Sequence, residues 1–126
     1  MRILFLCVSN AARSQMAEGL ARALLPASVT VESAGSEPGT LNPDAVAVMA
    51  EIGIDISKHQ PKGLDAVDVA GADVIVTLCA DEICPVVPGA VKRLHWPISD
   101  PVDVESSRAA RAQIQDRIEA LSRVLT

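Results

Sequence analysis

Residues 2–25 read RILFLCVSNAARSQMAEGLARALL and contain a strand, a loop and a helix in one stretch. The run Arg2–Leu6 is apolar after its first residue, which predicts a short buried strand. The later part has apolar residues at helical spacing: Met16, Leu20 and Leu24. The intervening loop therefore places Cys7 at the end of a strand and Arg13 at the start of a helix.

This loop, CVSNAAR, has the features of an anion cradle. Backbone N–H groups at a helix start lack intrahelical partners, and the helix dipole favours negative charge there. We expect these amides and the forked Arg13 guanidinium to bind a tetrahedral oxyanion. The same field favours the thiolate form of Cys7, which is its nucleophilic form. The expected oxyanion-binding residues are Cys7, Val8, Ser9, Asn10, Ala11, Ala12 and Arg13.

Composition restricts the class of protein. A chain of 126 residues, 49% of them apolar, is expected to form one domain, 1–126, with a proper core. The net charge of -5 argues against nucleic acid or an anionic membrane as partner. The apolar segment 3–8 is shorter than the core of a usual secretory signal, and no run approaches a membrane span. Three cysteines are an odd number for a disulfide framework, which favours a cytoplasmic location.

Strand-like and helix-like segments alternate along the rest of the chain. Further strands are expected at 29–33, 72–78 and 91–96. Asn42 is expected to cap a helix that begins at Pro43, and Asp103 to cap the last helix. The side chains expected to face the core from these two helices are Val46, Met49, Ala50, Ile114, Ile118, Leu121 and Leu125. A possible short helix lies at 64–69.

This alternation predicts an α/β fold, with a parallel sheet and helices on both faces. Right-handed crossovers restrict the topology further, although spacing alone leaves the strand order open. An order of 2-1-3-4 would place the Cys7 loop at a switch point, where open α/β sheets bind ligands.

The other two cysteines, Cys79 and Cys84, follow the strand 72–78, at the sheet edge that carries the Cys7 loop. One interpretation is a thiol relay, in which Cys79 attacks a Cys7 adduct and Cys84 moves the disulfide to the surface. A second treats both as structural thiols. A third is a metal site with His95, but the second ligand pair usual for zinc is absent.

Three polar residues near the loop each have two interpretations. Asp100, before Pro101, is either an acid that protonates a departing oxygen or a turn residue. Asn10 either adopts a left-handed backbone conformation that closes the cradle or is a plain polar loop residue. Ser14 either caps the helix or donates its hydroxyl to Cys7.

Taken together, CVSNAARSQMAEG, ESAGS, DISKH, VTLC, CP and HWPISDP resemble the arsenate reductase branch of the low-molecular-weight protein tyrosine phosphatase family. The resemblance extends over nearly the whole chain. It implies a three-layer α/β fold with a four-stranded parallel sheet in the order 2-1-3-4. It also implies one role for each of six residues: nucleophile Cys7, oxyanion clamp Arg13, thiolate stabiliser Ser14, resolving thiols Cys79 and Cys84, and acid Asp100.

The resemblance further implies arsenate as substrate, phosphate or sulfate as competing oxyanions, and no cofactor. Thioredoxin is the expected reductant, with glutaredoxin or a small thiol as alternatives, and the chain is expected to be a monomer. Some members bind potassium through residues that match Asn10, Glu18 and Ser33, together with an acid. Lys62 stands at the position of that acid, and its ammonium would repel the ion, so we predict no metal.

Two other functions use the same loop. A tyrosine phosphatase would hydrolyse phosphomonoesters through a Cys7 phospho-enzyme, but it needs an aromatic-walled slot. The chain has one Phe, one Trp and no Tyr, and it carries two thiols that a phosphatase does not need. A redox sensor would oxidise Cys7 and Cys79 but would leave Asp100 without a role. Arsenate reduction, with weak phosphatase activity, therefore gives a role to more of these residues than either of the other two functions.

Overall fold

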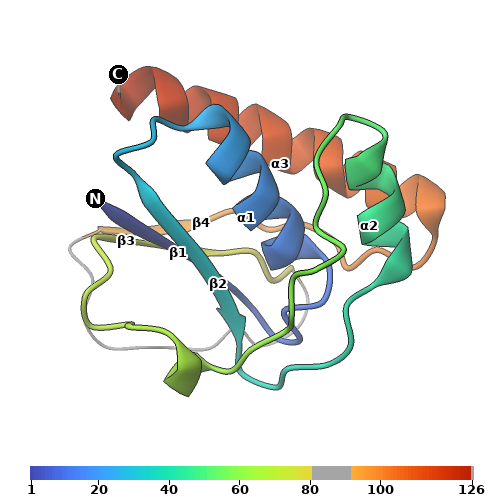
Figure 1. The fold of residues 1–126 in the computed structure, drawn as a ribbon, viewed down its shortest axis with the longest axis horizontal. Helices are drawn as coiled ribbons and strands as arrows, with labels where there is room; N and C mark the ends of the chain where they lie inside the picture. The colour runs from blue at the N-terminus through green and yellow to red at the C-terminus, as the bar shows by residue number, and fades with distance from the viewer. Residues whose placement is uncertain (81–91, 126) are drawn as a thin grey trace.

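A computed structural model describes residues 1–80 and 92–125 (Figure 1). Its strands are β1 (Arg2–Cys7), β2 (Thr30–Gly35), β3 (Val74–Thr77) and β4 (Lys92–His95). Its helices are α1 (Arg13–Leu24), α2 (Pro43–Ala50), α3 (Val104–Leu125) and the short 3₁₀ helix η1 (Leu64–Ala66). The elements agree with the sequence-based expectations except at 64–69, where only one 3₁₀ turn forms.

The four strands form one parallel sheet in the order β2-β1-β3-β4, as expected. In this register Cys7 at the end of β1 pairs with Gly35 of β2, and Leu6 pairs with Thr77 of β3. β1 is thus central, and the loop that follows it emerges between its two neighbours at the carboxyl edge. This is the switch point at which open α/β sheets bind ligands.

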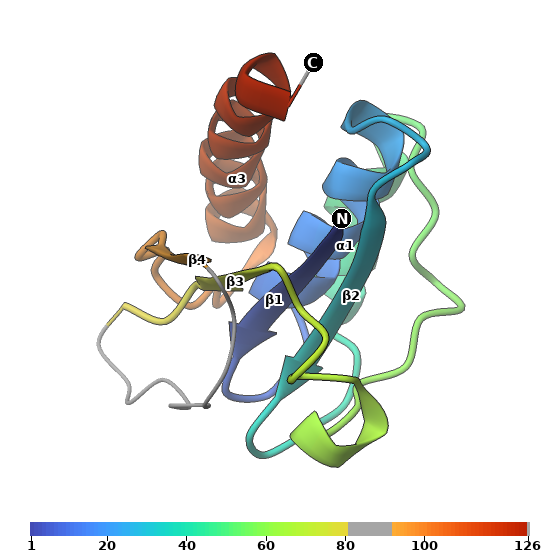
Figure 2. The same cartoon turned by 90° about the vertical axis from the view of Figure 1, so that its left-hand side faces the viewer.

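The two faces of the sheet are covered differently (Figure 2). The three α-helices pack on one face, and their apolar side chains join Ile3 and Phe5 of β1 in the main core. The other face carries Leu4 and Leu6, which pack with the segment around η1 in a smaller cluster. Helices were expected on both faces, and on this face the helical cover is the single 3₁₀ turn η1. A strand alternates its side chains between faces, so consecutive apolar residues of β1 serve both clusters.

Local capping explains where two of the helices begin. The Asn42 side chain accepts a hydrogen bond from the Asp44 N–H at 2.8 Å, and Asp103 Oδ1 accepts one from Ser106 N–H at 2.7 Å. Both caps were expected from the sequence. The inward face expected for α2 was partly wrong, because Ala50 is exposed and Val46 is only half-buried. The buried side chains of this helix are Ala45, Val48 and Met49.

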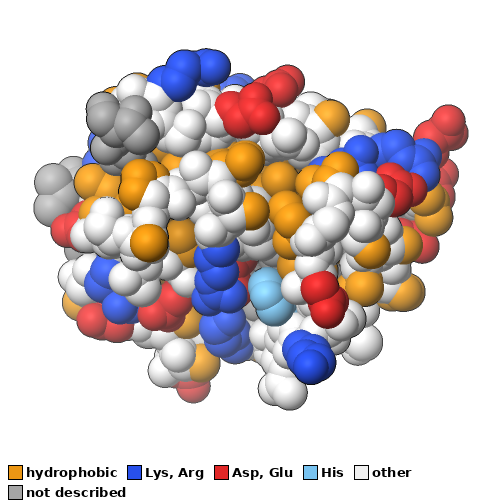
Figure 3. Space-filling model, turned by 45° about the horizontal axis from the view of Figure 1, so that its top comes forward, with side chains coloured by type: hydrophobic (Ala, Val, Ile, Leu, Met, Phe, Trp, Pro, Cys, Tyr) orange, Lys and Arg blue, Asp and Glu red, His pale blue; other side chains and the backbone are white. Residues whose placement is uncertain are grey.

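Acidic, basic and hydrophobic side chains are mixed on the face shown in Figure 3. No large patch of one charge sign occupies that face. Within residues 1–80 and 92–125, no helix is both long enough and apolar enough to cross a membrane.

Candidate active site

The loop of residues 8–12 leaves β1 and leads directly into α1. Its carbonyl groups are held by the segment 37–42: the N–H groups of Glu37, Gly39 and Asn42 donate to the carbonyls of Val8, Ser9 and Ala11. These bonds measure 2.8, 2.9 and 2.9 Å. Because the C=O and N–H of a peptide group point in opposite directions, the amides that follow these carbonyls face the interior of the loop.

The start of α1 adds to this concentration of donors. No side chain caps the helix, and its first turn contains no acid. No carboxylate in the first turn of α1 therefore pairs with the backbone amides at this end of the helix. The helix dipole favours an anion there. The geometry is that of an oxyanion cradle.

Cys7 lies at the base of the cradle and is a free, buried cysteine with 1% of its surface exposed. The backbone N–H of Asn10 donates to Cys7 Sγ at 3.2 Å, and Ser14 Oγ lies 2.9 Å from the same sulfur. Ser14 therefore contacts Cys7 instead of capping α1. Two polar groups thus contact the sulfur, and one of them, the Asn10 N–H, can only donate to it.

Asn10 has the left-handed backbone conformation expected for it, with φ of 52°. Its side chain donates to Ser14 Oγ at 2.7 Å and accepts from the backbone N–H of Lys62 at 3.0 Å. Asn10 thus connects the loop to a distant segment and is more than a polar loop residue.

Arg13 is 3% exposed and forms one wall of the cradle. Its Nη1 donates to the carbonyls of Leu78 at 3.4 Å and Ile98 at 2.9 Å. Its Nη2 lies 3.6 Å from Asp100 Oδ1, and the Asp100 side chain is 63% exposed. The structure therefore brings Asp100 to the cradle, where an exposed carboxyl group can meet a bound oxyanion.

Cys79 is also near the cradle. Leu78 N–H donates to the carbonyl of Leu6 at 2.9 Å, which extends the pairing of β1 and β3 to the residue before Cys79. The carbonyl that joins Leu78 to Cys79 accepts the Arg13 bond described above. Cys79 is buried, with 1% exposed. Cys84, the third cysteine, lies outside the described residues.

The zinc hypothesis gains no support from the part of the chain that the structure describes. No group of three histidine, cysteine, aspartate or glutamate side chains there is arranged to hold a metal. His95 instead pairs with Thr77, with Nδ1 2.6 Å from Thr77 Oγ1.

Neither aromatic residue of the chain lines the cradle as a ring-binding wall. Phe5 is fully buried and Trp96 is 6% exposed, and both belong to the main core. Their ring centroids are 6.0 Å apart. The slot that a tyrosine phosphatase needs for a phenyl ring would therefore have to be built without aromatic side chains.

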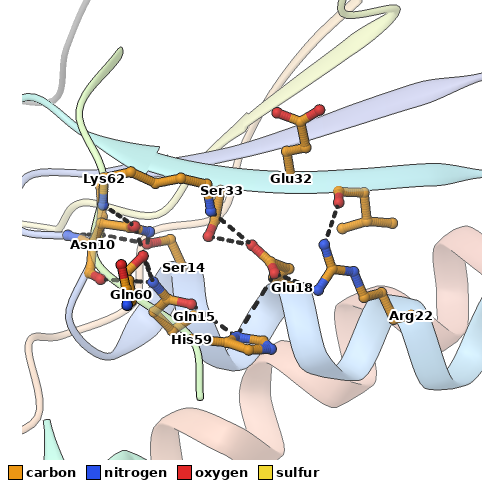
Figure 4. Close-up of polar contacts among 12 residues, drawn as sticks. Asn10, Ser14, Gln15, Glu18, Arg22, Glu32, Ser33, His59, Gln60 and Lys62 are labelled. Carbon is orange, nitrogen blue, oxygen red and sulfur yellow. Dashed lines mark hydrogen bonds and ion pairs between the residues drawn. The ribbon is translucent and has the colours of Figure 1, made fainter. Parts of the chain in front are cut away.

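A polar cluster behind the loop contains Glu18, Ser33 and Lys62, which the resemblance had grouped with Asn10 (Figure 4). At its centre is Glu18 of α1, only 3% exposed, which accepts from Ser33 Oγ at 2.6 Å and pairs with Arg22 at 2.6 Å. His59 Nδ1 and Lys62 Nζ each lie 3.7 Å from its carboxylate oxygens. Burial lowers the pKa of the His59 imidazole; Glu18 opposes this shift, whereas Arg22 and Lys62 add to it.

This cluster does not fit a potassium ion. The Lys62 ammonium lies beside Glu18, and the Lys62 backbone N–H donates a hydrogen bond to the Asn10 side-chain oxygen. The oxygens that would ligate a cation thus already have donors from the chain itself.

Comparison with known proteins identifies relatives of this chain. A family model described as low molecular weight phosphotyrosine protein phosphatase matches residues 2–126. The chain is 44% identical over 119 residues to an arsenate reductase of Shouchella clausii, covering 92% of this chain and 85% of that protein.

Solved structures of arsenate reductases are also similar to this chain. An arsenate reductase in the phosphate binding state has a TM-score of 0.88 at 31% identity, covering 99% of this chain and 98% of that one. A thioredoxin-dependent arsenate reductase of Corynebacterium glutamicum has a TM-score of 0.79 at 32% identity. That comparison covers 98% of this chain and 60% of the Corynebacterium chain.

Proposed function

Because the chain belongs to the low molecular weight phosphotyrosine protein phosphatase family, we propose that it works within that family as an arsenate reductase. Arsenate is a tetrahedral oxyanion of the size and charge that the amides and Arg13 are arranged to bind. The names of its relatives and the position of Cys79 after the carbonyl that Arg13 binds favour reduction over hydrolysis.

In the first step, the Cys7 thiolate attacks arsenic and forms a sulfur–arsenic bond while one arsenate oxygen leaves. Asp100 donates the proton that turns this oxygen into water, as a general acid. Arg13 and the loop amides stabilise the remaining charged oxygens. The position of Asp100 near Arg13 supports this role.

In the second step, the Cys79 thiolate attacks Cys7 Sγ and forms a disulfide. The sulfur–arsenic bond breaks, and its electron pair stays on arsenic, which leaves as arsenite. The two cysteines have lost two electrons and arsenic has gained them. Cys84 then attacks Cys79, which frees Cys7 and leaves a Cys79–Cys84 disulfide for an external dithiol to reduce.

One contact carries this proposal: the Arg13 guanidinium binds the carbonyl of the peptide that leads into Cys79. Cys79, which is disulfide-bonded in this structure, therefore directly follows the residue whose carbonyl Arg13 binds, and a phosphatase has no use for a cysteine there. The buried positions of Phe5 and Trp96 add support, because arsenate needs a small site without a ring-binding wall.

Thioredoxin is the proposed reductant, because a structurally similar relative is a thioredoxin-dependent arsenate reductase. We assign the protein to the cytoplasm, where thiols stay reduced between turnovers. We further propose that it acts as a monomer, since each residue of the scheme comes from one chain.

The same cradle and acid also suit phosphate monoesters. Phosphate and arsenate share shape and charge, so Cys7 attack on a small aryl phosphate is expected as a weak side activity. This activity needs Cys7, Arg13 and Asp100 but neither of the other cysteines.

The test is arsenite release from arsenate in the presence of thioredoxin, thioredoxin reductase and NADPH, with Cys79→Ala beside the parent. We expect multiple turnovers from the parent and none from the variant. Hydrolysis of an aryl phosphate by the variant is the control for an intact cradle. Undiminished turnover by Cys79→Ala would refute the relay. A parent inactive with thioredoxin and with glutathione plus glutaredoxin, yet active on aryl phosphate, would make the protein a phosphatase.

A further inference from the structure

Gln15 is a fully buried polar side chain to which the proposed chemistry assigns no role. It lies on the first turn of α1, next to Ser14, and its amide group contacts two other segments of the chain, the loop at Asn10 and residues 59–60. Its Nε2 lies 3.1 Å from the Asn10 carbonyl, 3.0 Å from Asn10 Oδ1 and 3.3 Å from the Gln60 carbonyl. Its Oε1 lies 3.0 Å from His59 Nδ1 (Figure 4).

The direction of each hydrogen bond in this group follows from donors and acceptors that have no choice. The Lys62 backbone N–H can only donate, so the Asn10 side-chain atom that it contacts is the amide oxygen. The Asn10 NH₂ group therefore faces Ser14 and donates to Ser14 Oγ. Since Ser14 has one hydrogen, that hydrogen is left for the Cys7 thiolate.

The orientation of the Gln15 amide group also follows from its fixed partners. Backbone carbonyls can only accept, so the group facing the Asn10 and Gln60 carbonyls is the Gln15 NH₂. The Gln15 oxygen then faces His59, which must carry its hydrogen on Nδ1 to donate. The bonds form one directed chain: His59 donates to Gln15, Gln15 to Asn10, Asn10 to Ser14 and Ser14 to Cys7.

Within this series of hydrogen bonds, Asn10 is the residue whose conformation depends on contacts with its neighbours. Its left-handed backbone is unusual for a residue with a side chain, and such a conformation persists only when its surroundings fix it. Gln15 binds both its carbonyl and its side-chain oxygen. Through Asn10, Gln15 therefore controls two donors that reach Cys7 Sγ, namely the Asn10 N–H and the Ser14 hydroxyl.

We propose that Gln15 is a positioning residue that holds Asn10 so that both of these hydrogen bonds reach the Cys7 thiolate. The proposal rests on the role of Cys7 as nucleophile, but it concerns the thiolate and not the fate of arsenic. Gln15 touches neither the sulfur nor a bound oxyanion, and it acts on Cys7 only through Asn10.

The test compares Gln15→Met, which keeps the length of the side chain and removes both polar ends, with Gln15→Glu. The glutamate variant keeps an acceptor for His59 but has no hydrogen to donate to Asn10. The readout is the rate at which iodoacetamide alkylates Cys7 as a function of pH, measured on the reduced protein by mass spectrometry of the Cys7 peptide. This readout needs no arsenate and separates Cys7 from the other thiols.

For both variants we expect alkylation at neutral pH to be about three- to tenfold slower, the worth of one hydrogen bond to a reactive group. The pH profile should shift upward, and the kcat for arsenate should fall more than KM changes. Leu20→Ala is the control, because Leu20 lies buried on the same helix in the main core, apart from the directed chain. It should lower Tm but leave the alkylation profile in place.

An unchanged profile in both Gln15 variants would overturn the proposal. So would the same shift in Leu20→Ala at an equal loss of Tm, since the effect would then reflect general loosening. If the parent releases no arsenite but the Gln15 variants still shift the profile, the positioning role stands and the proposed reaction fails. The two claims are thus separable.

Discussion

The loop around Cys7 packs closely on Gly35 of β2. A Cβ built at this position would overlap the Val8 carbonyl oxygen and stand 2.9 Å from the Asn10 nitrogen. Both atoms belong to the backbone, so neither can rotate away as a flexible side chain would. Glycine at this position allows the loop to fold tightly against β2 and to aim the Asn10 N–H at Cys7.

We therefore predict that Gly35→Ala displaces the loop, slows alkylation of Cys7 and lowers stability by about 1–3 kcal/mol, as overpacking does. Thermal unfolding and the alkylation rate measure the two effects. Gly39→Ala is the matched control, because its Cβ would lie an ordinary 3.6 Å from Ser9 Cβ. Equal behaviour of the two variants would show that close packing at Gly35 does not shape the loop.

At this scale, the sequence identified the residues whose neighbours along the chain define them. Cys7, Asn10 and Arg13 are recognisable because strand, loop and helix follow one another within a short stretch. Gln15 was missed because its partners His59 and Gln60 lie more than 40 positions away, and Glu18 was named only through the family resemblance. A buried Gln or Glu on a helix has no local signal that separates it from a solvated one.

Among the elements, α2 and α3 are joined by a cluster of charges. Arg108 binds both Glu51 oxygens, at 3.0 and 2.6 Å, and Arg111 Nη1 lies 2.8 Å from Glu51. The same Nη1 donates to the Val48 carbonyl at 2.6 Å, within the last turns of α2. The hydrogen bond from Arg108, followed by that from Arg111, lowers the pKa of Glu51 from 4.5 to about 2.

A lowered pKa in the folded state means that the ionised carboxylate favours folding. Its contribution is present above the unfolded value of 4.5 and is lost as pH falls toward about 2. We predict that Glu51→Gln lowers Tm at pH 7 and that its difference from the parent shrinks as pH approaches 2. Because the cluster is exposed, added salt should also reduce the difference.

Thermal unfolding between pH 7 and pH 2 measures this effect, with Asp116→Asn, an exposed position on α3, as the control. A Tm difference that persists undiminished at low pH would contradict the electrostatic explanation.

The helices and their caps were predictable from the sequence, because Asn42 and Asp103 act on the next residues along the chain. The inward face of α2 was not, since eight residues make only two turns and leave the periodicity weak.

For the whole molecule, the alternation of strands and helices predicted a parallel sheet, whereas the strand order came from the resemblance to a known family. Spacing cannot give the order, because each crossover can return on either side of the sheet. The order has a functional consequence: it places β3 beside β1, so that the residue before Cys79 reaches Arg13. The proposed reaction thus depends on a topology that places the carbonyl group before Cys79 against Arg13.

The most direct test of this account is a single turnover with Cys84→Ser. In this variant the relay should stop after the second step, since no thiol remains to resolve Cys79. One equivalent of arsenate should yield one equivalent of arsenite and a Cys7–Cys79 disulfide, detected by mass spectrometry of the linked peptides. Arsenite release without that disulfide, or no arsenite from a reduced protein that still hydrolyses aryl phosphate, would contradict the account.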